Sequence, residues 1–477
     1  MLRFINKEFY TKLLLLFIIV QPVLDILTYF SIQSLNINVT VGIIFRVLFM
    51  VVSLWFIFFG NSSRLKKYVI FYLMAMFVVF GIGLVYNYFA KPIFDPFVEL
   101  QFVAKTVYFF IMLCSYLLLF TNIDRKNDVS HRILRAVSVA MFIVSLTMFI
   151  AILTGTSSST YEWNKFGFKG WFFSGNELGS IVAVSFPLTY LYALIKSDGL
   201  KKVYYFIPVV MLAAVSILIG TKVGYFAVLG AGIIVFLCYL VYWSIQMIRK
   251  AKEPLTNMRL IFSFVFLALF LLVTPFSPSF SNVSGDVGAI NEQAEQKNNE
   301  TEQNKSNGEP SEKPGEETEP EQDQKNKEQN LMESPILKII LSSRNIYFTE
   351  LYNDYLDAAP MQKMFGMGYA GNYKENPKLI EMDFFDLFFS YGIMGFLFIL
   401  VPFLLIVGLF VKLLFQVPGR LLHPENMLIL LSIGLGTGIA FLAGHVLYAP
   451  AVNIYLAISM VLLIINMLKL NKQRKEA

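Results

Sequence analysis

The stretch "NPKLIEMDFFDLFFSYGIMGF" (376–396) places the carboxylates of Glu381, Asp383 and Asp386 at the start of an apolar run. The run continues from about residue 384 to 413, and a bilayer crossing takes about 20 mostly apolar residues. An acidic side chain at the centre of a bilayer costs about 2.5 to 3.5 kcal/mol on insertion scales. The stretch therefore predicts a membrane-spanning helix with acids at its aqueous end.

The rest of the chain has the same character. Of its 477 residues, 56% are hydrophobic and only 15% are charged, whereas soluble domains contain about 25% charged residues. Runs of spanning length lie near 13–32, 38–60, 67–87, 98–120, 133–154, 172–195, 203–220, 223–246, 259–276, 384–413, 426–446 and 448–468. We therefore predict an all-α polytopic membrane protein with about 12 transmembrane helices.

The net charge of +6 indicates how the chain is oriented in the membrane rather than a nucleic-acid partner. The basic residues form short clusters at alternate connections between the apolar runs, and no basic stripe is present. The positive-inside rule then predicts that both termini lie in the cytoplasm. The first apolar run has no small-residue cleavage site, so we expect it to be retained as a helix.

One large connection, 276–383, divides the chain into 1–275 with nine spans and 384–477 with three spans and a basic tail. The predicted topology places this connection outside the cytoplasm. Residues 284–329 are rich in Glu, Gln, Asn, Lys and Pro and lack aromatic residues, which predicts a disordered acidic tether. Residues 335–372 predict an amphipathic helix lying on or packing into the outer surface, followed by the Gly-rich turn "FGMGYAGN".

Charged and polar residues within the spans all fall at the outer level of the predicted topology. They are Asp25, Arg46, Lys105, Asn176, Glu177, Lys222 and His445. Because charges inside a membrane pair with one another or line a wet cavity, this shared depth predicts a functional cavity open to the outside. Structural alternatives remain open: an ion pair of Asp25 with Arg46 or Lys105, a turn cap at Lys222, and polar packing at His445.

The residue types suggest a chemistry for this cavity. Arg344, Lys222, Arg46 and Lys105 are suited to a phosphate or diphosphate, which favours a substrate with an anionic headgroup and a membrane-soluble tail. Asp383 could take a proton from an attacking hydroxyl, or Asp383 and Asp386 could simply stabilise the first turn of a helix. Neither a nucleotide-binding motif nor metal-ligand spacing is visible, so we predict no cofactor and no metal.

Several stretches resemble the O-antigen ligase and polymerase superfamily. They are "GWFFSGNELGSIVAVSFP" (170–187), "IGTKVGYFAVLGAG" (219–232), "SSRNIYFTELYNDYL" (342–356) and "MFGMGYAGN" (364–372) followed by "IEMDFFDLFFSYGIMGF". The resemblance implies a GT-C-like architecture with one large extracytoplasmic loop. It also implies a glycosyltransferase that polymerises or transfers a polyprenyl-diphosphate-linked glycan onto a glycan acceptor at the outer face of the plasma membrane.

In relatives, a basic residue after the seventh span and a loop arginine contact the donor diphosphate, and a loop histidine prepares the acceptor hydroxyl. By resemblance, Lys222 and Arg344 take the first two places. Only the carboxylates of Glu381 and Asp383 stand where the histidine is expected.

The predicted catalytic residues are therefore Asp383, Glu381 and Arg344. The predicted substrate-binding residues are Lys222, Arg344, Arg46, Lys105, Asn176, Asp386 and His445. Resemblance to Gram-positive members of the teichuronic acid polymerase type favours polymerisation over ligation. The alternative function is a flippase for lipid-linked glycans or another polytopic transporter, which predicts charges near the middle of the membrane and a path to both faces.

Overall fold

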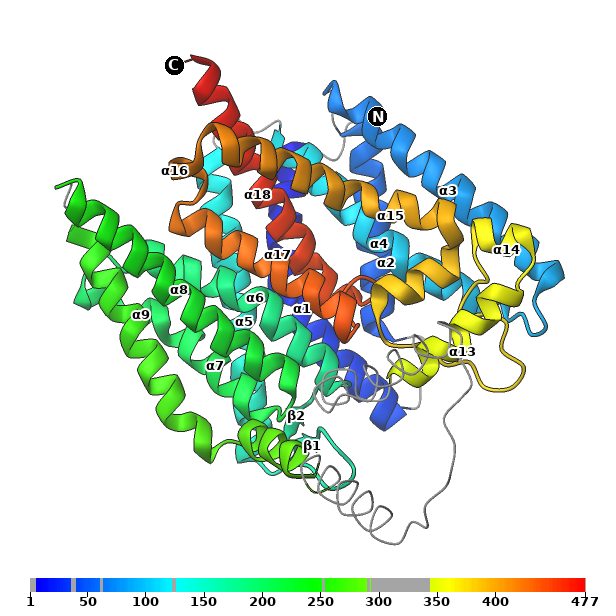
Figure 1. Cartoon of the computed structure of the whole chain (residues 1–477), viewed down its shortest axis with the longest axis horizontal. Helices are drawn as coiled ribbons and strands as arrows, with labels where there is room; N and C mark the ends of the chain where they lie inside the picture. Colours follow the sequence, from blue (N-terminus) through cyan, green and yellow to red (C-terminus); the bar gives the residue numbers. More distant parts are fainter. Residues whose placement is uncertain are drawn as a thin grey trace, which may run out of the picture.

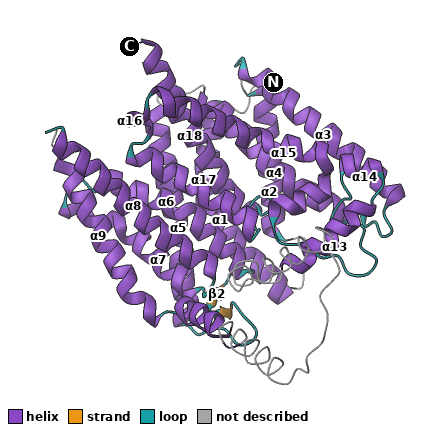
Figure 2. Ribbon diagram, viewed as in Figure 1, coloured by secondary structure: helices purple, strands orange, loops and turns teal. Residues whose placement is uncertain are grey.

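The computed structural model describes residues 6–35, 40–60, 63–121, 126–250, 254–289, 292 and 344–476. Within these ranges the regular secondary structure is helical apart from one two-stranded hairpin (Figures 1 and 2). Twelve of the helices have the length and composition to cross a membrane, which confirms the predicted fold class. Both termini lie at one end of the bundle, and the opposite end carries α13 (Arg344–Asp357) and the hairpin (Figure 1). We call this opposite end the α13 end.

The spanning helices are α1 (Lys7–Leu35), α2 (Val41–Phe59), α3 (Leu65–Ala90), α4 (Pro96–Thr121), α5 (Lys126–Leu153), α6 (Gly175–Lys196), α7 (Ile207–Leu218, preceded by η1, Leu200–Phe206), α8 (Lys222–Ile248), α9 (Pro254–Val273), α15 (Asp383–Gln416), α17 (Pro424–Leu442) and α18 (Pro450–Glu476). The shorter elements are β1 (Ser158–Ser159), β2 (Phe168–Gly170), η2 (Thr274–Phe276), α14 (Pro360–Phe365) and α16 (Pro418–Leu421).

Three helices form the centre of the bundle, because α4, α6 and α18 are buried over most of their length. Buried serine hydroxyl groups link two of these helices to α17, because polar groups in a bilayer bond to neighbouring helices rather than to water. Ser432 of α17 donates to the Val184 carbonyl of α6 at 2.5 Å and lies 2.7 Å from the hydroxyl of Ser459 on α18. These contacts join α6, α17 and α18 near the middle of each helix.

The tenth spanning helix, α15, is broken at Gly392, where the backbone adopts φ 63° and ψ −171°. This conformation is accessible essentially to glycine alone. The Gly-rich turn fills the break: the Met367 N–H donates to the Phe389 carbonyl at 2.9 Å, and the Gly368 N–H donates to the Ser390 carbonyl at 3.1 Å. The turn thereby satisfies backbone groups that the break exposes and holds the half-helix 383–391 in place.

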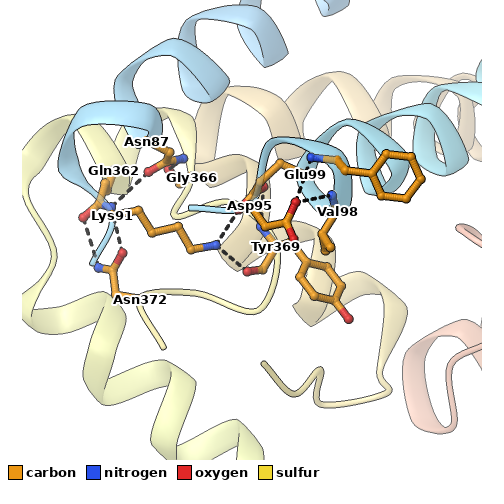
Figure 3. A network of polar contacts seen from close by, with 10 residues as sticks. Asn87, Lys91, Asp95, Val98, Glu99, Gln362, Gly366, Tyr369 and Asn372 are labelled. Carbon is orange, nitrogen blue, oxygen red and sulfur yellow. Dashed lines mark hydrogen bonds and ion pairs between the residues drawn. The ribbon is translucent and has the colours of Figure 1, made fainter. Parts of the chain in front are cut away.

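A buried polar network fixes the Gly-rich turn to α3 and α4 (Figure 3). Lys91 donates to the Glu99 carboxylate at 2.5 Å and to the Tyr369 carbonyl at 2.6 Å, and the Tyr369 N–H donates back to Glu99 at 2.9 Å. Asn87 donates to the Gly366 carbonyl at 2.9 Å. Burial lowers the pKa of Lys91, and the Glu99 carboxylate opposes this shift.

Lys91→Met should lower the free energy of unfolding by about 3 to 5 kcal/mol, because it leaves the Glu99 carboxylate buried without its cation. Chemical unfolding of the detergent-solubilised protein measures the change. The double variant Lys91→Met/Glu99→Gln removes both charges and should recover part of the loss. A single variant as stable as the wild type would show that the network does not hold the turn.

The large connection between α9 and α15 differs from the prediction at its start. Residues 278–289 are helical, so the predicted tether is wrong for 284–289. Apart from residue 292, the rest of the predicted tether lies outside the described residues, as does the first part of the predicted amphipathic helix. The described part, α13, packs Leu351 in an apolar cluster with Phe389 of α15. The division of the chain at 275 and 383 stays a prediction.

Candidate functional site

A cavity of about 290 Å³ opens at the α13 end between α2, α4, α6 and the connection from α17 to α18. Its lining includes Arg46, Lys105, Glu177, His445 and Tyr448. Three residues predicted from the sequence, Arg46, Lys105 and His445, therefore meet in one concave space. A volume near 300 Å³ is at the lower limit for pockets that bind small molecules.

The two cations of this cavity differ in their partners. Arg46 forms an ion pair with Asp25 and donates to the Gln21 side chain at 3.2 Å, so the predicted structural pair between α1 and α2 exists. Lys105 forms no ion pair with any described residue. The Glu177 carboxylate lines the same cavity and interacts with Lys105 electrostatically. Because no ion pair holds its amine, Lys105 is suited to an anionic ligand.

Three charged side chains converge beside the cavity. Glu381 Oε2 lies 3.2 Å from Arg344 Nη2 and 3.7 Å from His445 Nε2. The Glu381 side chain is 43% exposed, whereas that of Arg344 is 12% exposed. The carboxylate is therefore accessible to solvent, and the guanidinium contacts it from the buried side. We call Arg344, Glu381 and His445 the charged triad.

The contacts within the triad shift the pKa values of Glu381 and His445. His445 and Arg344 hold the pKa of Glu381 below its ordinary value, although burial opposes this. Burial by itself lowers the pKa of His445, but the Glu381 carboxylate outweighs this effect and raises the pKa overall. His445 Nε2 has no hydrogen-bond partner among the described residues. The histidine is therefore a stronger base than usual, and its Nε2 is buried on the side of the ring that faces Glu381.

Backbone strain is concentrated at the same place. Glu381 and His445 both adopt left-handed backbone conformations, with φ values of 64° and 61°, which side chains other than glycine rarely take. Gly444 has φ 68°, and a Cβ atom there would lie 2.6 Å from the Glu381 carbonyl oxygen. Two strained residues held against each other by tight packing are typical of functional sites.

The two predicted aspartates lie behind the triad. Asp383 and Asp386 are 0% exposed. Asp383 accepts the backbone N–H groups of Val446 and Leu447 at 2.8 and 2.6 Å. Asp386 accepts those of Ile380 and Met382 at 2.8 and 3.1 Å, together with the Tyr448 hydroxyl at 3.2 Å. The geometry therefore favours a positioning role for both aspartates: they hold the two loops that present Glu381 and His445.

Lys222 belongs to a second cationic cluster. Its amine and that of Lys165 each lie 2.9 Å from the carboxylate of Asp286, on the helix 278–289. These lysines hold the pKa of Asp286 below its ordinary value, although burial opposes the shift. The cluster and the cavity lie on either side of the start of α6: Glu177 lines the cavity, and Gly179 packs against Thr221, the residue before Lys222.

Asn176 lies on the same first turn of α6, with an exposed side chain outside the lining of the cavity. The sequence placed Glu177 at the level of the predicted cavity but not among the predicted substrate-binding residues, and Tyr448, Lys165 and Asp286 were left out of the predicted site. An acid within "SGNELGS" at the start of a span was the available signal for Glu177. No comparable signal marked Asp286, which lies in a stretch with the composition of a tether.

The described residues contain no group of three or more His, Cys, Asp or Glu that could hold a metal ion. The model of one protein family, described as O-antigen ligase like membrane protein, matches residues 7–470. No curated protein and no solved structure matches the chain. Because the match covers nearly all of the twelve-helix bundle, the chain belongs to the O-antigen ligase-like family of membrane proteins.

Proposed function

We propose that the protein is a glycosyltransferase that polymerises or transfers a polyprenyl-diphosphate-linked glycan at the outer face of the plasma membrane. The observation that carries this proposal is the charged triad beside a cavity that contains Lys105 and Arg46. Membership of the family supports an enzyme of glycan synthesis, and the triad supplies the acid–base and anion-binding groups that a transfer reaction requires.

In this proposal the cations bind the diphosphate of the donor. Arg344 offers a planar fork to phosphate oxygens, and Lys105 offers a point charge that no carboxylate of the described residues holds in an ion pair. Lys222 flanks the site across α6. Negative charge grows on the diphosphate as it leaves, so preorganised cations stabilise the transition state more than the ground state.

His445 acts as the general base. His445 lies in the connection between α17 and α18, and its ring lies beside Glu381. Glu381 occupies the place in the sequence where relatives carry their histidine, so His445 brings an imidazole to the same place in space. As the acceptor hydroxyl attacks the anomeric carbon of the donor, His445 takes the hydroxyl proton at Nδ1, the ring nitrogen that does not face Glu381. The new glycosidic bond forms, the bond from the anomeric carbon to the diphosphate breaks, and the diphosphate leaves with the electron pair. Glu381 orients the imidazole and stabilises its charged form.

The proposed orientation follows from the ends of the bundle. Both termini lie opposite the α13 end, and the basic clusters favour a cytoplasmic location for the termini. The cavity would then face the extracytoplasmic side. A flippase needs a polar path to both faces, whereas the charged residues that line the cavity gather at one end, which favours a transferase.

The test uses the purified protein in lipid nanodiscs with polyprenyl-diphosphate oligosaccharides from the host. We expect longer glycans to form together with free polyprenyl diphosphate. Passage of the donor across a vesicle membrane without any release of polyprenyl diphosphate would instead establish a flippase.

A further inference from the structure

A second, more polar groove of about 520 Å³ lies at the α13 end, between the β1–β2 hairpin and residues 275–281. Its lining includes Ser157, Ser159, Lys165, Phe166, Phe276 and Ser281. We propose that this groove binds the glycan of the lipid-linked donor, at the sugars remote from the reacting end. The inference rests on the proposed function, because it assigns a subsite to that substrate.

The groove is a built site rather than a gap between mobile segments. Its two walls are 116 residues apart in the sequence and are joined by Asn282, which is buried. The Phe166 N–H donates to Asn282 Oδ1 at 3.0 Å, and Asn282 Nδ2 donates to the carbonyls of Phe166 at 2.6 Å and Gly220 at 3.0 Å. Ser279 also donates to the Ile217 carbonyl at 3.0 Å, which fixes the 278–289 helix on the end of α7.

The lining matches the two surfaces of a sugar ring. The rings of Phe166 and Phe276 are 73% and 89% exposed and offer apolar faces on which the C–H face of a pyranose can pack. The serine hydroxyls add hydrogen-bonding groups: Ser159 donates its own hydrogen to the Tyr161 carbonyl at 2.6 Å, so its oxygen can accept from a sugar hydroxyl.

The polarity of the groove argues against a lipid as its occupant. A different groove, between α7 and α9, has a volume of about 260 Å³ and is lined by Phe206, Phe262, Leu269 and other apolar residues alone. Hydrocarbon chains suit that lining, whereas serine hydroxyls and a charged lysine would lose their hydration against a lipid tail.

The position of the groove identifies which part of the substrate reaches it. Lys165 lines the groove and shares the carboxylate of Asp286 with Lys222, at 2.9 Å for each pair. The groove therefore lies next to Lys222, the cation proposed to flank the donor diphosphate, because Asp286 pairs with both lysines. Sugars that extend from the reacting end toward Lys222 would continue into the groove.

The test fills the groove and leaves the triad untouched. Ser281→Trp places an indole in the groove, and the matched control Ser284→Trp places one on the next turn of the same helix, outside the lining. The free oligosaccharide is released by mild acid from the lipid-linked material of the host and titrated into nanodisc-embedded protein. Ser281→Trp should bind it at least about tenfold more weakly than the wild type, whereas Ser284→Trp should bind it as the wild type does. Phe276→Ala, at a highly exposed ring that folding does not need, should weaken binding about two- to tenfold.

Equal affinities for the wild type, Ser281→Trp and Phe276→Ala, or no binding to the wild type, would overturn the inference. Release of polyprenyl diphosphate by the wild type is measured in parallel and separates the two proposals. If polyprenyl diphosphate is released but the groove variants bind the oligosaccharide as tightly as the wild type, only the assignment of the groove is refuted. If the groove variants weaken binding but no polyprenyl diphosphate is released, the groove is supported as a glycan site and the proposed transfer reaction is refuted.

Discussion

His445→Gln should lower kcat/KM for glycan transfer by about 10²- to 10⁴-fold, the usual contribution of a general base. Glutamine keeps a polar side chain of similar reach beside Glu381 but cannot accept the proton of an attacking hydroxyl. The KM for the donor should change little, because the cations that bind the diphosphate remain. Steady-state release of polyprenyl diphosphate from nanodisc-embedded enzyme measures both parameters.

The pH profile distinguishes a base from a structural histidine. In the wild type, transfer should fall on the acid side as His445 becomes protonated, at a pH above the ordinary histidine value of about 6.5, because Glu381 raises the pKa of His445. Glu381→Gln removes that negative charge, so the pKa of His445 falls and the acid limb moves to lower pH. The maximal rate should fall as well, because the ring is no longer oriented. A Glu381→Gln profile with an unmoved acid limb contradicts this assignment.

Asp383→Asn provides the matched control for the alternative base. Asp383 accepts two backbone N–H groups and is fully buried, so the amide should loosen the loop at 446–447 and lower the thermal stability. We expect partial loss of activity that follows the loss of stability. Complete loss of transfer with an unchanged melting temperature would instead make Asp383 the base, as one interpretation of the sequence has it.

The membrane fold could be predicted from the sequence because hydropathy is a local property. Each of the twelve spans is an apolar run that can be recognised without knowledge of its neighbours. The break at Gly392 could not be predicted, because an isolated glycine in an apolar run fits an unbroken span equally well. Its conformation depends on the Gly-rich turn around Gly366, which is close in space but lies before the span in sequence.

The different roles of the three acids could not be predicted from the sequence either. Glu381, Asp383 and Asp386 look equivalent at the start of a span, yet only Glu381 is exposed. What separates them is the loop of His445, which supplies the N–H groups that bury Asp383. Partners about 60 residues away leave no trace in a local pattern, so the sequence could not distinguish the environments of the three acids.

Arg344→Ala should lower kcat for transfer by about 10²- to 10³-fold, the range found when one preorganised donor to a developing negative charge is removed. Arg344 begins α13, is largely buried and contacts the exposed carboxylate of Glu381, so its guanidinium is held ready before the donor binds. Arg344→Lys restores the charge without the planar fork and should recover only part of the rate.

Two comparisons decide whether Arg344 acts on the diphosphate or only positions Glu381. Arg420→Ala, at an exposed arginine on α16, is the control for the loss of a cation and should leave transfer unchanged. If Arg344 merely supports the carboxylate, the double variant Arg344→Ala/Glu381→Gln should be no slower than Glu381→Gln alone. If Arg344 stabilises the leaving diphosphate, the losses in the double variant should multiply, because the two side chains then act on opposite ends of the reaction: one on the departing phosphate and the other, through His445, on the attacking hydroxyl.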